Sequence, residues 1–307
     1  MASPTRPLKV GLLLPETEGQ FDGGNARWSD LLAMARAAEA IGVDSIWVTD
    51  HLLHQDDDGN RWGMWECWSL MAALAAVTER VALGSLVLCT AFRNPALLAK
   101  MADTVDEISG GRLILGLGAG WNEPEYRAFG YPFDHRVARF EEALTIITTL
   151  LREGRIDVEG TYYQARECEL RPRGPCPQGP PILVGTTGEK MMALTARHAD
   201  EWNTWFSQSG NRIEGLVPLL ARVDAACAAA GRDPQTLVRS AAVKLEVGPH
   251  SPSKMSAPGI AGTPEELAES LRAHAAIGLA HVQVWLEPNT LAGIEAFGRV
   301  LEALDRG

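Results

Sequence analysis

The sequence lacks the features that mark membrane-spanning, secreted and zinc-binding proteins. No apolar run reaches the roughly 18 residues of a membrane span. The first stretch, MASPTRPLKVGLLLP, has no separate cleavable apolar region, so it predicts a first strand and not a signal peptide. The five cysteines are scattered without CxxC or zinc-ligand spacing, which indicates free thiols in a reducing cytosol. We therefore expect a cytoplasmic protein without a metal site.

Positive charge is also scarce. The chain has 28 Lys and Arg against 39 Asp and Glu, a formal net charge of -11, which argues against a nucleic-acid partner. It has no GxSxG, Walker or GxGxxG motif and no His/Cys/Asp cluster at metal-ligand spacing, so metal hydrolysis and acyl transfer have little support. What is present is a chain of 307 residues that is 46% hydrophobic, enough to bury a full core.

Strand-like and helix-like segments alternate along the chain. Short apolar runs predict strands at 8–15, 44–50, 81–90, 112–118, 181–185, 200–205, 237–248 and 281–287. Amphipathic patterns predict helices at 26–42, 65–79, 94–109, 135–154, 188–199, 212–231, 263–278 and 291–305. Eight such units predict a closed (β/α)8 TIM barrel, with a doubly wound open sheet as the alternative. We find no linker or internal repeat and expect a single domain over residues 1–307.

Residues 155–181 interrupt this alternation. The segment is rich in Pro and Gly and has no helical period. It predicts an insertion between strands four and five, with a hairpin around Gly160.

Asp50 and His51 stand together where the second expected strand ends. In a TIM barrel the functional site lies at the carboxyl ends of the strands. A histidine beside an acid can hydrogen-bond a cofactor carbonyl or move a proton near neutral pH. The alternative is that Asp50 caps the following loop and His51 is a partly buried structural residue.

The turn from strand five to the next helix is a candidate phosphate site. The strand ends at Gly185, and a helix begins near Gly188. Unpaired amide groups at a helix start, with the positive end of its dipole, favour an anion. Thr186 and Thr187 add hydroxyl groups, and Lys190 adds charge. The alternative is a plain strand-to-helix turn.

Glycines follow one another at alternate positions in GRLILGLGAGWNEPEYRAFGYPF, at Gly116, Gly118 and Gly120. Glycine at a strand end indicates that another group approaches the backbone closely. That group is either a planar cofactor or the barrel's own packing.

Three long stretches together resemble the bacterial luciferase-like superfamily of flavin- and deazaflavin-dependent oxidoreductases. They are AEAIGVDSIWVTDHL, FRNPALLAKMADTVDEISGGRLILGLGAGWNEPEYRAFGYPF and PPILVGTTGEKMMALTARHADEWN. The chain is most similar to the branch that uses coenzyme F420, in which strand two ends in Asp-His. The resemblance implies a barrel whose insertion, 155–181, lies over the mouth.

The resemblance also implies which residues bind the cofactor. Asp50 and His51 lie beside the ring, a non-prolyl cis peptide near Leu86-Val87 forms a bulge behind it, and the glycine stretch passes along the ring and its chain. Residues Gly185 to Glu189 hold the phosphate. The implied cofactor-binding set is Asp50, His51, Leu86, Val87, Cys89, Gly118, Gly120, Asn122, Gly185, Thr186, Thr187, Gly188 and Glu189.

The implied activity is hydride transfer between coenzyme F420 and a small organic substrate, with His51 as the catalytic proton donor. Two alternatives stay open: an FMN-dependent monooxygenase that uses reduced flavin and O2, and a non-catalytic flavin-binding protein. We also expect a flavin or F420 reductase as a partner. A homodimer is expected too, because the alanine-rich faces of helices 26–42 and 65–79 permit close packing.

Candidate substrate-pocket residues are Glu66, Trp121, Tyr126 and Trp205. Trp121 stands where the sugar-phosphate dehydrogenases of the superfamily have a glutamate, which makes a sugar phosphate a doubtful substrate. For Glu66 the alternative is that it caps the start of its helix.

Overall fold

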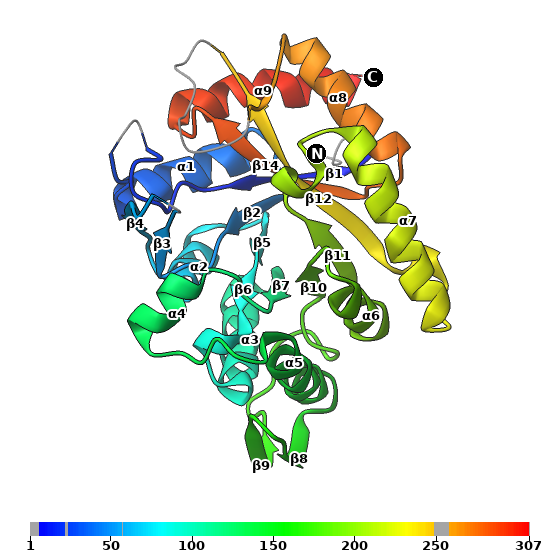
Figure 1. Cartoon of the computed structure of the whole chain (residues 1–307). Helices are drawn as coiled ribbons and strands as arrows, with labels where there is room; N and C mark the ends of the chain where they lie inside the picture. Colours follow the sequence, from blue (N-terminus) through cyan, green and yellow to red (C-terminus); the bar gives the residue numbers. More distant parts are fainter. Residues whose placement is uncertain (1–5, 22–23, 57, 249–257, 307) are drawn as a thin grey trace.

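Figure 1 shows the computed structural model of the chain, which describes residues 6–21, 24–56, 58–248 and 258–306. Eight parallel strand positions surround a lumen, and each strand pairs with the next one along the chain. The ring closes because the last strand pairs with the first, so the TIM barrel is confirmed and the open sheet is wrong. The strands are β1 (Lys9–Leu13), β2 (Ser45–Val48), β5 (Ala82–Ser85) continued by β6 (Leu88–Cys89), β7 (Leu113–Gly118), β10 (Ile182–Gly185), β11 (Glu201–Thr204), β12 (Val238–Glu246) and β14 (His281–Glu287).

The expected helices cover the outside of this barrel. They are α1 (Trp28–Ala40), α2 (Cys67–Val77), α3 (Pro95–Ser109), α5 (Arg136–Glu153), α6 (Glu189–His198), α7 (Ile213–Ala229), α8 (Pro264–Ala276) and α9 (Leu291–Arg306). Local sequence explains their ends. Asn94 caps α3 by accepting the amide hydrogens of Ala96 and Leu97, and Gly110 ends the helix at a φ of 69°.

Two apolar layers hold the barrel. The larger core runs from Leu8 to Leu304 between strands and helices. A smaller cluster fills the lumen, because inward-facing positions of the strands alternate with outward-facing ones. It contains Leu13, Trp47, Leu86, Leu183, Phe206 and Ala242. Bonds between Arg6 and Asp305, at 2.5 and 3.0 Å, join the segment before β1 to the end of α9.

Several short elements were not expected from the sequence. The loop after β2 contains a hairpin, β3 (Leu53–Gln55) and β4 (Arg61–Gly63), and a short helix, α4 (Glu123–Phe129), follows β7. Three single-turn helices, η1 (Thr90–Phe92), η2 (Phe206–Ser209) and η3 (Pro234–Thr236), and the two-residue strand β13 (Ile260–Ala261) complete the described part. The third expected strand is divided at Leu86-Val87, whose peptide bond is cis, as expected.

Residues 155–181 contain the expected hairpin, formed by β8 (Arg155–Glu159) and β9 (Gln164–Glu169). The hairpin contacts α5, on the outside of the barrel. The carboxylate of Glu142 in α5 accepts the amide hydrogens of Thr161 and Tyr162, each at 2.8 Å. The buried side chains of Ala165 and Leu170 join the outer core. The hairpin therefore lies along α5 and points away from the barrel (Figure 1).

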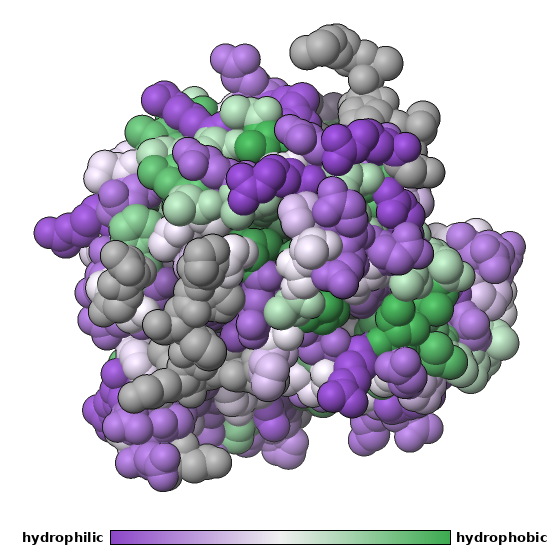
Figure 2. Space-filling model, turned by 90° about the horizontal axis from the view of Figure 1, so that it is seen from above, coloured by the Kyte–Doolittle hydropathy of each residue, from purple (hydrophilic) through white to green (hydrophobic). Residues whose placement is uncertain are grey.

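Polar and charged residues cover most of the face shown in Figure 2, and apolar side chains gather in smaller patches. Among the residues that the structure describes, every helix is too short or too polar to cross a membrane.

Candidate functional site

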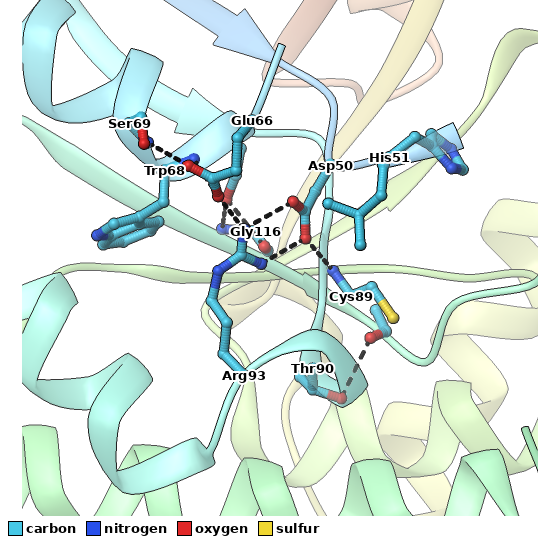
Figure 3. Close-up of polar contacts among 12 residues, drawn as sticks. Asp50, His51, Glu66, Trp68, Ser69, Cys89, Thr90, Arg93 and Gly116 are labelled. Atoms are coloured by element: carbon cyan, nitrogen blue, oxygen red, sulfur yellow. Dashed lines mark hydrogen bonds and ion pairs between the residues drawn. The ribbon is translucent and has the colours of Figure 1, made fainter. Parts of the chain in front are cut away.

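A buried ion-pair network lies where β2, β6 and α2 meet (Figure 3). Arg93 donates to both oxygens of Asp50, at 2.7 and 2.9 Å, and also bonds to the carboxylate of Glu66. The amide of Cys89 donates to Asp50 at 2.9 Å. Both oxygens of Asp50 are thus engaged by the protein. This favours the alternative in which Asp50 holds the local structure over direct contact between its carboxylate and a cofactor.

Glu66 caps α2. Its carboxylate accepts the amide hydrogens of Trp68 and Ser69, at 3.1 and 2.7 Å. The capping alternative for Glu66 is confirmed, and its place as a substrate-pocket residue has no support from these contacts.

His51 points away from this network (Figure 3) and makes a different ion pair. Its Nδ1 lies 2.9 Å from Oε1 of Glu125, and the second oxygen of Glu125 accepts the amide hydrogen of Leu52 at 3.0 Å. Burial acts to lower the pKa of His51, but Glu125, with Asp50 and Glu16, outweighs it and raises that pKa. Sequence reasoning missed the role of Glu125, which is 74 positions from His51.

Aromatic rings surround His51 at the mouth. The ring centroids of His51 and Trp121 are 5.6 Å apart at an interplanar angle of 80°. His54 of β3 lies 5.5 Å from Trp121 and 5.6 Å from Trp62 of β4. Trp121 is 61% exposed, which leaves much of its face open to a ligand. The sequence did not single out His54; the Asp58-Gly59 turn between short alternating segments was the signal for this hairpin.

Tyr126 does not line a substrate pocket. It is fully buried, and its hydroxyl lies 2.9 Å from Sγ of Cys89 and donates to the carbonyl of Ala119 at 2.8 Å. The rings of Phe92 and Phe133 pack against it at 5.2 and 5.1 Å. The turn of α4 places position 126 on the face that packs against β6. Tyr126 and Cys89 therefore support the wall of the barrel from behind.

The glycines of β7 make room for the protein itself. A Cβ at Gly118 would lie 2.7 Å from Cγ2 of Val87, and one at Gly116 would meet the carbonyl oxygen of Ser85. A Cβ at Gly120 would meet the hydroxyl of Tyr126. These contacts support the packing alternative for this side of the strand. Asn122 is likewise engaged, because its amide donates to the carbonyl of Leu53 at 2.8 Å.

The turn between β10 and α6 keeps partly open backbone. Gly185, Thr186 and Thr187 are half-buried, and Gly188 and Glu189 are exposed. The hydroxyl of Thr186 accepts the amide hydrogen of Gly188 at 3.0 Å. Within the described part of the chain, no side chain caps the start of α6 or of α5.

A cavity of about 380 Å³ lies between the starts of α5 and α6. Arg136 and Lys190 give it positive charge, and both helices turn the positive ends of their dipoles toward it. These features together suit a phosphate group. Phe133, His135, Arg136, Val137, Ala138 and Lys190 line it.

A second aromatic group lies where β11 and β14 reach the mouth. The centroid of Trp205 is 4.6 Å from that of Phe206 and 5.6 Å from that of Trp285. Lys244, paired in register with Trp285, is 1% exposed, and its Nζ lies 3.4 Å from Oε2 of Glu287. Sequence reasoning missed Lys244, although a lysine at an inward position of an apolar strand was a signal.

The fold and the position of these groups define a parallel α/β barrel with its candidate site at the carboxyl ends of the strands. Residues 8–251 match the luciferase-like monooxygenase family, and the chain belongs to this family.

Curated relatives include pyrimidine monooxygenase RutA of Cronobacter sakazakii, 38% identical over 174 residues, which cover 55% of this chain and 50% of that protein. RutA of Methylorubrum extorquens is 38% identical over 181 residues, which cover 56% of this chain and 47% of that protein. The match thus spans about half the length of these relatives.

Solved structures share the fold over nearly the whole chain. An F420-dependent secondary alcohol dehydrogenase, in complex with an F420-acetone adduct, has a TM-score of 0.78 at 20% identity and covers 97% of this chain and 99% of that one. A riboflavin lyase with modified FMN and riboflavin has a TM-score of 0.80 at 16% identity and covers 97% and 91%. At these identities the likeness shows the fold alone.

Proposed function

We propose that this protein is a monooxygenase that uses reduced FMN and O2 to oxygenate a small planar nitrogen heterocycle of the pyrimidine kind. One oxygen atom enters the substrate, the other leaves as water, and reduced FMN supplies the two electrons. The observation that carries the cofactor part is the basic cavity between α5 and α6. The relatives named pyrimidine monooxygenases support the reaction and the substrate class.

The residues present fit a flavin mononucleotide. Arg136, Lys190 and the uncapped starts of α5 and α6 would hold its phosphate. The apolar bulge at Leu86 and Val87 would support its ring. Reduced flavin, when bound, supplies the chemistry that activates oxygen.

The chain's own residues would orient the substrate, exclude water and supply a proton. Trp121, His54 and Trp62 offer ring faces against which a planar heterocycle stacks. His51 directs its Nε2 away from Glu125, and this nitrogen would donate a hydrogen bond or a proton to the reacting group. Because the reaction consumes reduced FMN, a separate flavin reductase is the partner we propose.

A second candidate is hydride transfer with coenzyme F420. This candidate is favoured by His51 at the end of β2 and by the cations Arg136 and Lys190, which suit an acidic cofactor tail.

A binding titration separates the two candidates. Purified apoprotein is titrated with FMN and, separately, with F420, and the fluorescence of its nine tryptophans reports binding. Tight FMN binding with weak F420 binding is the expected result, and oxidation of uracil with reduced FMN and O2 would follow it. The reverse preference would replace the monooxygenase with hydride transfer. Binding of neither by the folded protein would refute both.

A further inference from the structure

We propose that Glu125 is the positioning residue of His51: it selects Nε2 as the ring nitrogen that meets the ligand and keeps the imidazole ready to donate a proton. This inference deepens the proposed function and rests on it for the role of His51. The pairing itself can be measured without any cofactor.

The first step of the argument is geometric. The side chain of Glu125 is only 2% exposed, whereas that of His51 is 20% exposed. One carboxylate oxygen contacts Nδ1 of His51 at 2.9 Å. The other accepts the amide hydrogens of Leu52 and Leu53, at 3.0 and 3.4 Å. One buried carboxylate thus fixes both the ring and the backbone that carries it.

The second step concerns the free edge of the ring. Among the residues that the structure describes, Nε2 of His51 has no hydrogen-bond partner. The rings of Trp121 and His54 pack edge-on against the ring of His51, at interplanar angles of 80° and 81°, and so limit its rotation. A ring held at Nδ1 and exposed at its other side presents Nε2 to whatever occupies the mouth.

The third step concerns charge. An anion in contact with Nδ1 stabilises the imidazolium, and Asp50 and Glu16 act in the same direction. His54 also faces the ring, and its own pKa is lowered by burial and then by His51. Asp50 is already paired with Arg93. Glu125 is therefore the acidic group in direct contact with the ring.

The place of Glu125 follows from α4. This short helix begins after Asn122, contains Pro124 in its first turn and ends at Gly130 with a φ of 78°. It turns Glu125 inward, whereas Glu123, in the same turn, is exposed. Glu123 thus provides a matched control on the same element.

The test is an NMR titration of the imidazole of His51 in the apoprotein, with its resonances assigned by their loss in His51→Gln. In Glu125→Gln, which can still accept the Leu52 amide hydrogen, we expect the pKa of His51 to fall by about one unit. The balance between the two neutral tautomers should also change. Glu123→Gln should titrate as the wild type does. An unchanged titration in folded Glu125→Gln would overturn the proposal.

Two further variants separate positioning from simple loop support. Asn122→Ala removes the bond to Leu53 but leaves the Glu125–His51 contact, so the pKa of His51 should stay near that of the wild type. A shift as large as in Glu125→Gln would mean that Glu125 only holds the loop. If Glu125→Gln does not fold, the imidazole of His51 is titrated in the shorter Glu125→Asp instead, where a lowered pKa of His51 supports the pair and an unchanged one refutes it.

Activity then tests the link to function. If the protein oxidises a substrate, the acidic side of the kcat profile should move with the pKa of His51 in Glu125→Gln. If the pKa of His51 shifts in Glu125→Gln but the protein binds no flavin, the Glu125–His51 pair is supported and the proposed function is refuted. If flavin turnover is normal in Glu125→Gln at every pH, the positioning role is refuted and the function remains.

Discussion

At the scale of single residues, the packing of β7 against the bulge at Val87 leads to a stability prediction. Gly118→Ala would place a Cβ 2.7 Å from Cγ2 of Val87, and we expect a loss of about 1–3 kcal/mol in the free energy of unfolding. Val87→Ala in the same chain should restore part of that loss. Urea unfolding measures both. Gly188→Ala, whose Cβ meets nothing closer than Thr186 Oγ1 at 3.8 Å, is the control, and an equal loss there would contradict this explanation.

Also at this scale, the sequence located candidate side chains better than their partners. Asp50 and His51 could be placed at a strand end from local pattern alone. Arg93 and Glu125 lie 43 and 74 positions away from them, and no local pattern reports such contacts. The same limit explains why the sequence left the β7 glycines open between a cofactor and packing, since Val87 and Tyr126 come close to them only in the fold.

At the scale of elements, the hairpin β8–β9 supports a second prediction. Glu142→Ala removes the acceptor for the amide hydrogens of Thr161 and Tyr162, so amide hydrogen exchange in this turn should accelerate. Glu141→Ala is the matched control: its ion pair with Arg197 joins half-exposed side chains. Unchanged exchange in Glu142→Ala, or an equal acceleration in Glu141→Ala, would contradict this explanation.

Regular elements were predictable because their signals are local. Apolar periodicity identified the helices of the barrel, and buried apolar runs identified its strands. The β3–β4 hairpin and α4 are too short to show a period. The position of residues 155–181 depended on contacts with α5, a tertiary property that composition does not report.

At the scale of the whole molecule, buried polar groups join the first residues of β11 and β14. Burial raises the pKa of Glu201 to about 7 and lowers the pKa of His281 to about 3. His281 bonds to the hydroxyl of Ser45 at 2.8 Å, and its Nδ1 lies 3.7 Å from Glu201. Glu201 therefore stabilises the fold more at low pH, where it keeps its proton. His281 stabilises the fold more at high pH, where it is neutral in both states.

The sign for each group follows from linkage. In the unfolded chain Glu201 ionises around its ordinary pKa of 4.5, while the folded chain keeps the proton to about 7, so this group's contribution to stability falls as pH rises between these values. His281 is neutral when folded, so its contribution falls as pH drops below its ordinary pKa of 6.5 toward about 3.

Glu201→Gln leaves only the histidine effect. The free energy of unfolding of this variant, relative to the wild type, should therefore increase between pH 5 and pH 8, by on the order of 1–3 kcal/mol. Urea unfolding at the two pH values measures it, with the exposed Glu123→Gln as the control that should follow the wild type. A constant difference between Glu201→Gln and the wild type across this range would show that Glu201 is ionised in the folded barrel, and the buried layer would then have to hold a charge that its apolar surroundings disfavour.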